Sequence, residues 1–401
     1  MERGISFLGI FVMLGIAWLF SNNKKKMNWR IIGGGLALQV VLAVIILKTA
    51  PGIAVFESAK DFVNAIIGLS DEGAKMVFGD NFRDHYFAFK VLPTIIFVSS
   101  LSYLMFYFGF LQKIVEGLAW VMYKVMGVSG TESLSAAANV FCGQTEAPIF
   151  IKPYLDTMTK SEIMCMMTGG MATVAGGVLA AYVGLGVPAG HLLAASFMSA
   201  PAAIVIAKIM HPETEVSPTR GKVTIQLKIE EVNAFEAACK GATDGLYLCL
   251  NVGAMLIAFV ALVAFFNYIL SGVGGLFGFE ITIQEILSWV FTPLAWVMGV
   301  PWEDAPKIGL LLGEKMALNE FLAYIHLSEL IKEGAISERA EIIATYALCG
   351  FANFSSIAIQ IGGIGGLAPK RKQDFARSGF KAMIGGTLAA FITACIAGVL
   401  L

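Results

Sequence analysis

The feature that most constrains this chain is the length of its apolar runs that contain no charged residue. A helix needs about 20 mostly apolar residues to cross the hydrocarbon core of a bilayer. The uncharged runs are 4–23, 31–47, 91–112, 163–207, 245–279, 342–369 and 382–401. The run 163–207 contains the turn sequence Gly-Leu-Gly-Val-Pro at 184–188 and is interpreted as two spans, which makes eight. Because lipid cannot satisfy open backbone groups, all eight are predicted to be helices.

Composition supports a membrane protein. Hydrophobic residues make up 57% of the 401 residues and charged residues 14%, whereas soluble domains have roughly 45–50% and about 25%. The net charge of −1 argues against a nucleic-acid partner. The six cysteines form no C-x-x-C pair and are interpreted as buried hydrophobes. The histidines and glycines match neither a zinc-protease nor a P-loop motif, so no cofactor is expected.

The distribution of basic residues predicts the orientation. If the N-terminus is external, the inside segments are 21–30, 112–160, 208–242 and 370–381, and they hold 18 of the 28 Lys and Arg residues. This matches the positive-inside rule. The first basic cluster follows the first apolar run, which argues against a cleaved signal peptide. We therefore expect a multi-pass protein of the cell (inner or plasma) membrane with both termini external.

Two apolar stretches, 131–158 and 303–331, carry Glu, Gln, Asn or Pro near their centres. They are predicted to be re-entrant helical hairpins, because broken backbone at membrane depth must be covered by protein or water. Each is followed by two spans, and the alternating topology gives the two units opposite orientations. Such inverted-topology repeats are typical of secondary transporters.

The predicted fold is therefore an all-α polytopic membrane protein with eight transmembrane helices, two re-entrant hairpins and an inverted-topology repeat. Four regions are expected: N-terminal scaffold helices with an external segment (1–111), the first repeat (112–207), a cytoplasmic connection with the sixth span and an interfacial segment (208–302), and the second repeat (303–401).

Each hairpin carries a carboxylate where charge is costly. Glu146 lies in the first hairpin and Glu320 in the second, and the helices that follow have polar breaks at 172–177 and 351–356. Ionisable groups at membrane depth are usually functional, although a role in holding helices together remains open. Carboxylates and amides suit a neutral, polyhydroxylated or heterocyclic solute. The oxygen atoms of broken helices suit a hard cation such as sodium.

Three motifs carry a family resemblance. Gly-Gln-Thr-Glu-Ala-Pro at 143–148, Asn-Glu-Phe at 319–321 and Phe-Ala-Asn-Phe-Ser-Ser at 351–356 resemble those of bacterial concentrative nucleoside transporters, which are sodium/nucleoside symporters. The resemblance covers essentially the whole chain. It implies a homotrimer that imports nucleosides such as uridine with an inward sodium gradient by alternating access, and that is not an enzyme. It also implies that a transport domain moves on a scaffold domain. The choice between purine and pyrimidine nucleosides stays open.

The resemblance also implies site residues. The nucleobase would contact Gln144, Thr145, Glu146 and Val178, and the ribose would contact Glu320, Asn353 and Ser356, with Leu248 and Phe351 as apolar walls. Sodium would bind the side chains of Asn139 and Thr173 and the backbone carbonyls near Cys142 and Val174.

Alternative functions remain at this point. Coupling could use protons through Glu146 or Glu320, but proton-coupled members of the family tend to lack the Asn at the position of Asn139. Paired hairpins could also build a passive channel. An intramembrane enzyme is disfavoured, because no nucleophile and base are visible together.

Overall fold

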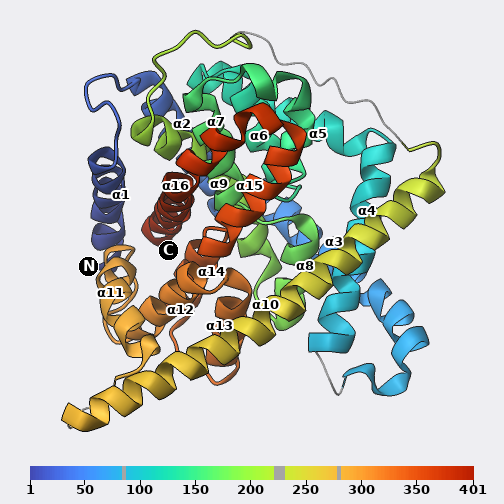
Figure 1. The fold of residues 1–401 in the computed structure, drawn as a ribbon, viewed down its shortest axis with the longest axis vertical. Helices are drawn as coiled ribbons and strands as arrows, with labels where there is room; N and C mark the ends of the chain where they lie inside the picture. The colour runs from blue at the N-terminus through green and yellow to red at the C-terminus, as the bar shows by residue number, and fades with distance from the viewer. Residues whose placement is uncertain (84–86, 221–230, 278–280) are drawn as a thin grey trace.

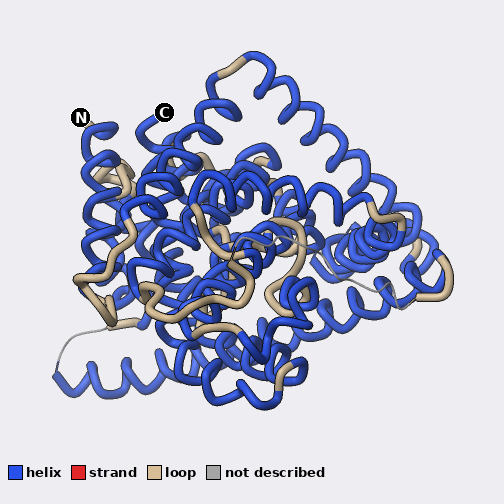
Figure 2. The backbone as a smooth tube through the Cα atoms, turned by 90° about the horizontal axis from the view of Figure 1, so that it is seen from above, coloured by secondary structure: helices blue, strands red, loops and turns tan. Residues whose placement is uncertain are grey.

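The chain is helical throughout its described parts. The computed structural model describes residues 1–83, 87–220, 231–277 and 281–401, and these residues form helices and connecting segments without a strand (Figure 1, Figure 2). Within these ranges, seven helical segments are long and apolar enough to cross a membrane: Glu2–Leu19, Trp29–Lys48, Ala88–Tyr107, Lys160–Leu185, Ala189–Met210, Ala234–Val273 and Pro369–Leu400.

The one expected span that is missing from these seven, 342–369, is divided into two half-helices. Helix α14 (Glu338–Leu348) ends at Cys349, and α15 (Phe354–Leu367) begins only after Asn353. Gly350 between them has a φ of 117°, a left-handed conformation that favours glycine and that a helix cannot contain. The non-helical segment 349–353 overlaps the polar break expected at 351–356 and begins two residues before it, and residues 354–356 are already helical.

The N-terminal region supplies helices that surround the repeats. They are α1 (Glu2–Leu19), α2 (Trp29–Lys48), α3 (Ala50–Phe78), the short 3-10 and π segments η1 (Asp80–Arg83) and η2 (Phe87–Val91), α4 (Leu92–Tyr107) and α5 (Phe110–Met126).

Two units of the same element order follow. Each consists of a helical hairpin, a broken helix and a long helix. The first comprises α6 (Gly130–Asn139), the 3-10 helix η3 (Ala147–Thr157), α7 (Lys160–Ala172), α8 (Gly176–Leu185) and α9 (Ala189–Met210). The second comprises α12 (Ala305–Ala317), α13 (Glu320–Lys332), α14, α15, the short η4 (Pro369–Arg371) and α16 (Lys372–Leu400). Their opposite orientation in the membrane, the re-entrant course of the hairpins and the four-region division stay predictions.

The two hairpins differ in their second arm. In the first unit this arm is a 3-10 helix that contains Pro148 and Pro153, whereas in the second it is the α-helix α13. Proline lacks a backbone N–H and clashes with the preceding turn of an α-helix. The prolines therefore account for the tighter, less regular arm of the first hairpin.

Helix α10 (Ala234–Phe277) is the longest element of the fold. Its 44 residues extend about 66 Å at 1.5 Å per residue, roughly twice the hydrocarbon thickness. Figure 1 shows it running obliquely across the whole molecule. It packs on α4 through Gly241, where an added Cβ would lie 2.8 Å from the Ser100 Cα. The span expected at 245–279 is therefore the later part of a longer helix, and its last residues, 278–279, lie outside the described ranges.

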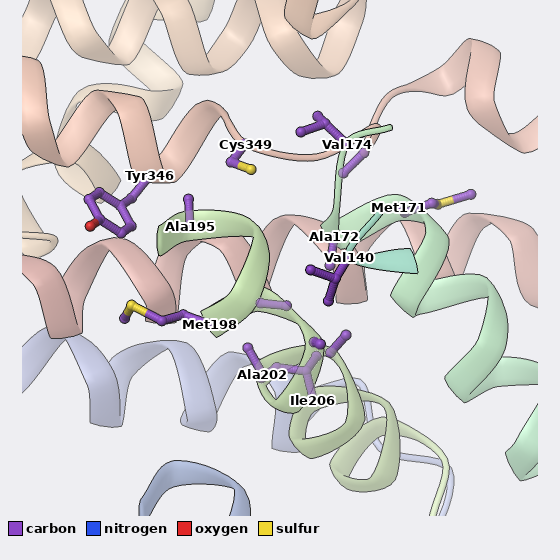
Figure 3. Close-up of a cluster of buried hydrophobic side chains, with 14 of the residues drawn as sticks. Val140, Met171, Ala172, Val174, Ala195, Met198, Ala202, Ile206, Tyr346 and Cys349 are labelled. Carbon is purple, nitrogen blue, oxygen red and sulfur yellow. The ribbon is translucent and has the colours of Figure 1, made fainter. Parts of the chain in front are cut away.

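Burial separates a core from a sheath. In the spans Lys160–Leu185 and Ala189–Met210, 89% of the most apolar window is buried, whereas in α10 only 6% is. Figure 3 shows part of this core, where Met198, Ala202 and Ile206 of α9 gather with Ala172 of α7. Apolar side chains that remain exposed on the outer helices suit contact with lipid tails. Helix α11 (Ile283–Val297) packs along α12 and contributes Phe291 and Ala295 to the core.

The two chain termini lie next to each other (Figure 2). The guanidinium of Arg3 donates a hydrogen bond to the carbonyl of Leu401. Residues Glu2, Arg339 and Leu401 help to line a surface cavity of about 460 Å³ beside them. The termini therefore share one face of the molecule, and the assignment of that face to the outside stays a prediction.

Candidate functional site

The carboxylate of Glu320 lies between donors from the two units. Glu320 begins α13 and is 5% exposed. Its Oε1 accepts a hydrogen bond of 3.0 Å from the hydroxyl of Tyr182 on α8. Its Oε2 accepts one of 2.8 Å from the amide Nδ2 of Asn353, at the start of α15. A buried carboxylate needs such partners, because desolvation of an unpaired charge is costly.

Asn353 serves the helix and the site together. Its Oδ1 caps α15 by accepting from the backbone N–H of Ser356 at 2.9 Å and from the hydroxyl of Ser355 at 2.7 Å. An Asn at an N-cap satisfies an otherwise unpaired N–H of the first turn. Because the oxygen is committed to the cap, the NH₂ group is directed towards Glu320.

The first hairpin reaches the same place from the other unit. Nε2 of Gln144 donates to the hydroxyl of Ser356 at 3.1 Å. Thr145 packs against α15, since a Cβ added to Gly363 would come within 2.5 Å of its Cγ2. The structure therefore brings together Gln144, Thr145, Glu320, Asn353 and Ser356. Within the described chain, Oε1 of Gln144 is buried without a hydrogen-bond partner.

The other four residues predicted to bind substrate lie outside this group. The Glu146 carboxylate is partly exposed and turns back on the hairpin tip, where its Oε2 accepts from the N–H of Gly143 at 2.9 Å. Val178 is buried on α8, whereas Leu248 and Phe351 are half-buried at the margin of the core. This hydrogen bond gives Glu146 a local role in closing the hairpin tip.

The residues predicted to bind sodium meet at the last turn of α7. The hydroxyl of Thr173 donates to the carbonyl of Gly169 at 3.0 Å, and a Cβ on Gly169 would lie 3.2 Å from Nδ2 of Asn139. Nδ2 of Asn139 donates to the carbonyl of Ser135 at 2.9 Å. Its Oδ1 is buried and finds no partner in the described residues. Cys142 and Val174 are buried in the adjacent tip and break.

The breaks of the two units touch each other. A Cβ on Gly350 would lie 2.6 Å from the carbonyl oxygen of Met171 and 2.7 Å from the carbonyl carbon of Ala172. Figure 3 shows Cys349 and Val174, one from each break, in the same buried cluster. The end of α7 and the break before α15 are therefore in close contact inside the core.

Sequence reasoning missed two polar residues of this region. Tyr182, which donates to Glu320, stacks on Tyr324 with ring centroids 4.1 Å apart. Gln360 of α15 is fully buried and donates from Nε2 to the carbonyl of Met167 at 3.1 Å. An amide within an apolar run was the available signal for Gln360. Nothing in the sequence distinguishes Tyr182 from an ordinary packing aromatic.

Comparison with known families accounts for nearly the whole chain. Residues 8–81 match the family described as "Na+ dependent nucleoside transporter N-terminus", residues 88–189 match "Nucleoside recognition", and residues 191–398 match "Na+ dependent nucleoside transporter C-terminus". The chain belongs to the Na+-dependent nucleoside transporter family. The family is one of membrane transporters and not of enzymes.

Curated relatives of this family are similar over the full chain. Solute carrier family 28 member 3 of Mus musculus is 44% identical over 99% of the chain, and sodium/nucleoside cotransporter 1 of Rattus norvegicus is 42% identical over 100%. The chain spans 58% and 64% of their lengths. An uncharacterized transporter of Haemophilus influenzae is 45% identical over 98% of the chain and 96% of its own length.

Solved structures of the family share the fold. CNTnw in an inward-facing substrate-bound state superposes with a TM-score of 0.93 at 41% identity, covering 100% of this chain and 98% of that one. A double variant of CNTnw in an outward-facing state gives a TM-score of 0.95 with the same identity and coverage. The same fold is therefore known in states open to opposite sides.

Proposed function

We propose that this protein is a secondary active symporter of the cell membrane that imports nucleosides with an inward sodium gradient by alternating access. The observation that carries the proposal is the polar site at the start of α15, which both hairpin tips contact. There Glu320 and Gln144 come from different repeats and converge on Asn353 and Ser356 of α15. Relatives named as sodium/nucleoside cotransporters support the substrate class and the ion.

The donor and acceptor inventory of the site suits a nucleoside. An ionised carboxylate offers about four lone-pair positions, and two of those on Glu320 are taken by Tyr182 and Asn353. The remainder can accept both hydroxyls of a ribose diol. Gln144 offers an unpartnered buried oxygen to a base edge. Thr145 and Glu146 add polar groups beside it, and Val178, Leu248 and Phe351 supply apolar walls.

Sodium is assigned to the last turn of α7. The unpartnered Oδ1 of Asn139, the hydroxyl of Thr173 and the carbonyls of Cys142 and Val174 are neutral oxygens, which a hard cation prefers. Ion binding would order the tip of the first hairpin, which carries Gln144. Nucleoside binding would then cost less ordering entropy, and that difference is the source of coupling.

The larger assembly follows the same family expectation. We propose that the two repeats form a moving transport domain on a scaffold that includes residues 1–111, and that three copies assemble as a homotrimer with external termini. Cross-linking of the purified protein should yield a trimer as its largest product. A monomer under all cross-linking conditions would contradict the assembly but not the transport function.

Uptake of labelled uridine into proteoliposomes tests the proposed function. We expect uridine to accumulate against its gradient only when sodium is higher outside, and collapse of the sodium gradient with an ionophore should abolish accumulation. A proton gradient alone should not replace sodium. Accumulation driven by protons would favour proton coupling, and equilibration without accumulation would indicate a channel.

Nucleoside preference is measured in the same vesicles. Unlabelled purine and pyrimidine nucleosides compete for uridine uptake, and we expect free bases to compete poorly because they lack the diol that Glu320 accepts. Strong competition by free bases would contradict the assignment of ribose to Glu320, Asn353 and Ser356.

A further inference from the structure

A buried lysine lies next to the substrate site without taking part in it. Lys315 of α12 is 1% exposed. Its Nζ donates to the carbonyl of Ala347 at 2.9 Å and to the carbonyl of Cys349 at 3.4 Å. The break that begins at Cys349 leads to Asn353, which donates to the Glu320 carboxylate at 2.8 Å. Burying an ammonium away from water is costly, so its hydrogen-bond partners must compensate for the lost solvation.

The two carbonyls belong to the end of a helix. Ala347 is in the last turn of α14, and Cys349 is its C-cap at the start of the second break. The last carbonyls of a helix have no intrahelical partner, and they carry the negative end of the helix dipole. The Lys315 ammonium satisfies two of them in a segment that is buried from water.

In the first repeat, the first arm of the hairpin presents a neutral side chain to the end of the helix that follows. Asn139, at the end of α6, lies against the last turn of α7, as Lys315, near the end of α12, lies against the last turn of α14. The Asn139 Oδ1 is an acceptor that the described residues leave without a partner. One break thus presents an open oxygen, and the other presents a fixed positive charge.

We propose that Lys315 is a built-in cation that fills, in the second repeat, the position that the coupling sodium fills in the first. This inference rests on the proposed function, because it assigns the first break to a transported ion. Lys315 holds the end of α14 and the break that leads to Asn353, and thereby positions the ribose-binding groups. A single sodium ion therefore accompanies each nucleoside.

Wild-type protein gives the first measurement. In proteoliposomes, uridine uptake should move one positive charge per uridine and depend on sodium with a Hill coefficient of about one. Two charges per uridine would overturn the proposal. This readout needs no variant, so it decides the question even where substitutions of Lys315 prevent folding.

Two substitutions separate charge from space. Lys315→Ala removes the ammonium and leaves room, so at low sodium uridine should bind about tenfold or more weakly, because charge-assisted hydrogen bonds are lost. High sodium should restore its affinity, with a Hill coefficient that rises towards about two as an ion enters the vacated position. Lys315→Met removes the charge but fills the space, so sodium should not restore binding. Lys332→Ala, an exposed lysine on α13, serves as the control and should behave as wild type.

The outcomes distinguish this inference from the proposed function. Absence of sodium-driven uptake by the wild type would remove both. Sodium-driven uptake with wild-type affinity in Lys315→Ala, or with a loss in folded Lys315→Ala that sodium does not restore, would overturn only the role of Lys315. Equal recovery of Lys315→Ala and Lys315→Met at high sodium would also overturn it, since a filled space cannot admit the ion.

Discussion

Glu320 shows at the scale of one residue why its charge, and not only its shape, matters. Both oxygens accept from neutral donors, Tyr182 and Asn353. A neutral amide at this position would keep the size of the side chain. It would lose one acceptor oxygen and bring an NH₂ group against donors that already point inward.

We therefore predict that Glu320→Gln weakens uridine binding by about 10- to 100-fold, since hydrogen bonds to a charged group contribute roughly 1.5–3 kcal/mol. Binding is measured by calorimetry with sodium in excess. Glu329→Gln, an exposed position on the same helix, is the matched control. Wild-type affinity in the Glu320 variant would show that the ribose assignment is wrong.

A substitution at the proposed ion site should change the sodium requirement without changing nucleoside binding. Asn139→Ala removes the unpartnered Oδ1 without touching the Glu320 cluster. The sodium concentration for half-maximal uptake should rise several-fold, while uridine affinity at saturating sodium stays close to wild type. Asn64→Ala on the exposed side of α3 is the comparison. An unchanged sodium requirement would place the ion elsewhere.

At the scale of elements, the crossing of the two breaks holds the site together. Each hairpin tip contacts a half-helix of the other repeat: Gln144 reaches α15, and Glu320 reaches α8 through Tyr182. The contact between Gly350 and the end of α7 sets the spacing of these partners. A change in that contact should therefore be felt in stability and binding together.

Gly350→Ala tests this crossing. The new Cβ would lie 2.6 Å from the Met171 carbonyl oxygen at a φ of 117°, and left-handed strain alone costs about 1–3 kcal/mol. We expect a lower unfolding temperature in detergent and weaker uridine binding. Gly362→Ala on α15, where a Cβ meets nothing within 4 Å, should leave both unchanged. Equal behaviour of the two variants would contradict the close crossing.

At the scale of the whole molecule, coupling means that sodium binding and nucleoside binding share one interaction free energy. The proposed ion site lies on the first repeat and the proposed ribose-binding groups lie on the second, and the first hairpin tip contacts both. If sodium orders that tip, the factor by which sodium tightens uridine binding must equal the factor by which uridine tightens sodium binding.

This reciprocity can be measured on purified protein. Uridine affinity is determined at several sodium concentrations, and sodium affinity at several uridine concentrations. We expect equal factors of about 5- to 150-fold, the usual range of coupling free energies. In Asn139→Ala sodium should bind more weakly, but the two factors should remain equal to each other. A factor of one in the wild type would mean that the two ligands bind independently, and coupling through the hairpin tip would be abandoned.

Part of the fold and of the candidate site could be predicted from the sequence. The apolar runs were enough for a helical membrane protein, and the polar breaks at 172–177 and 351–356 correctly located the unwound segments. The rule that an ionisable residue at membrane depth is functional points to Glu146 and Glu320, but it does not separate them from other buried charged residues. Glu132, Glu162 and Lys208 are buried as well, and the Glu162 Oε1 accepts from Ser129 at 2.6 Å and from Thr131 at 2.9 Å in a network at the base of the first hairpin.

The class of fold, the approximate places where helices break and the family can all be predicted from the sequence, because hydropathy, glycine and short motifs act locally along the chain. The hydrogen-bond partners of the buried polar groups follow only from the packing of the helices. This packing joined Glu320 to Tyr182, placed Gln144 on Ser356 and turned Lys315 towards the end of α14. These pairs are far apart in the chain or separated by a helical break, so no local pattern encodes them. Their geometry exists only once the two repeats pack and leave each buried polar group to find a donor or acceptor.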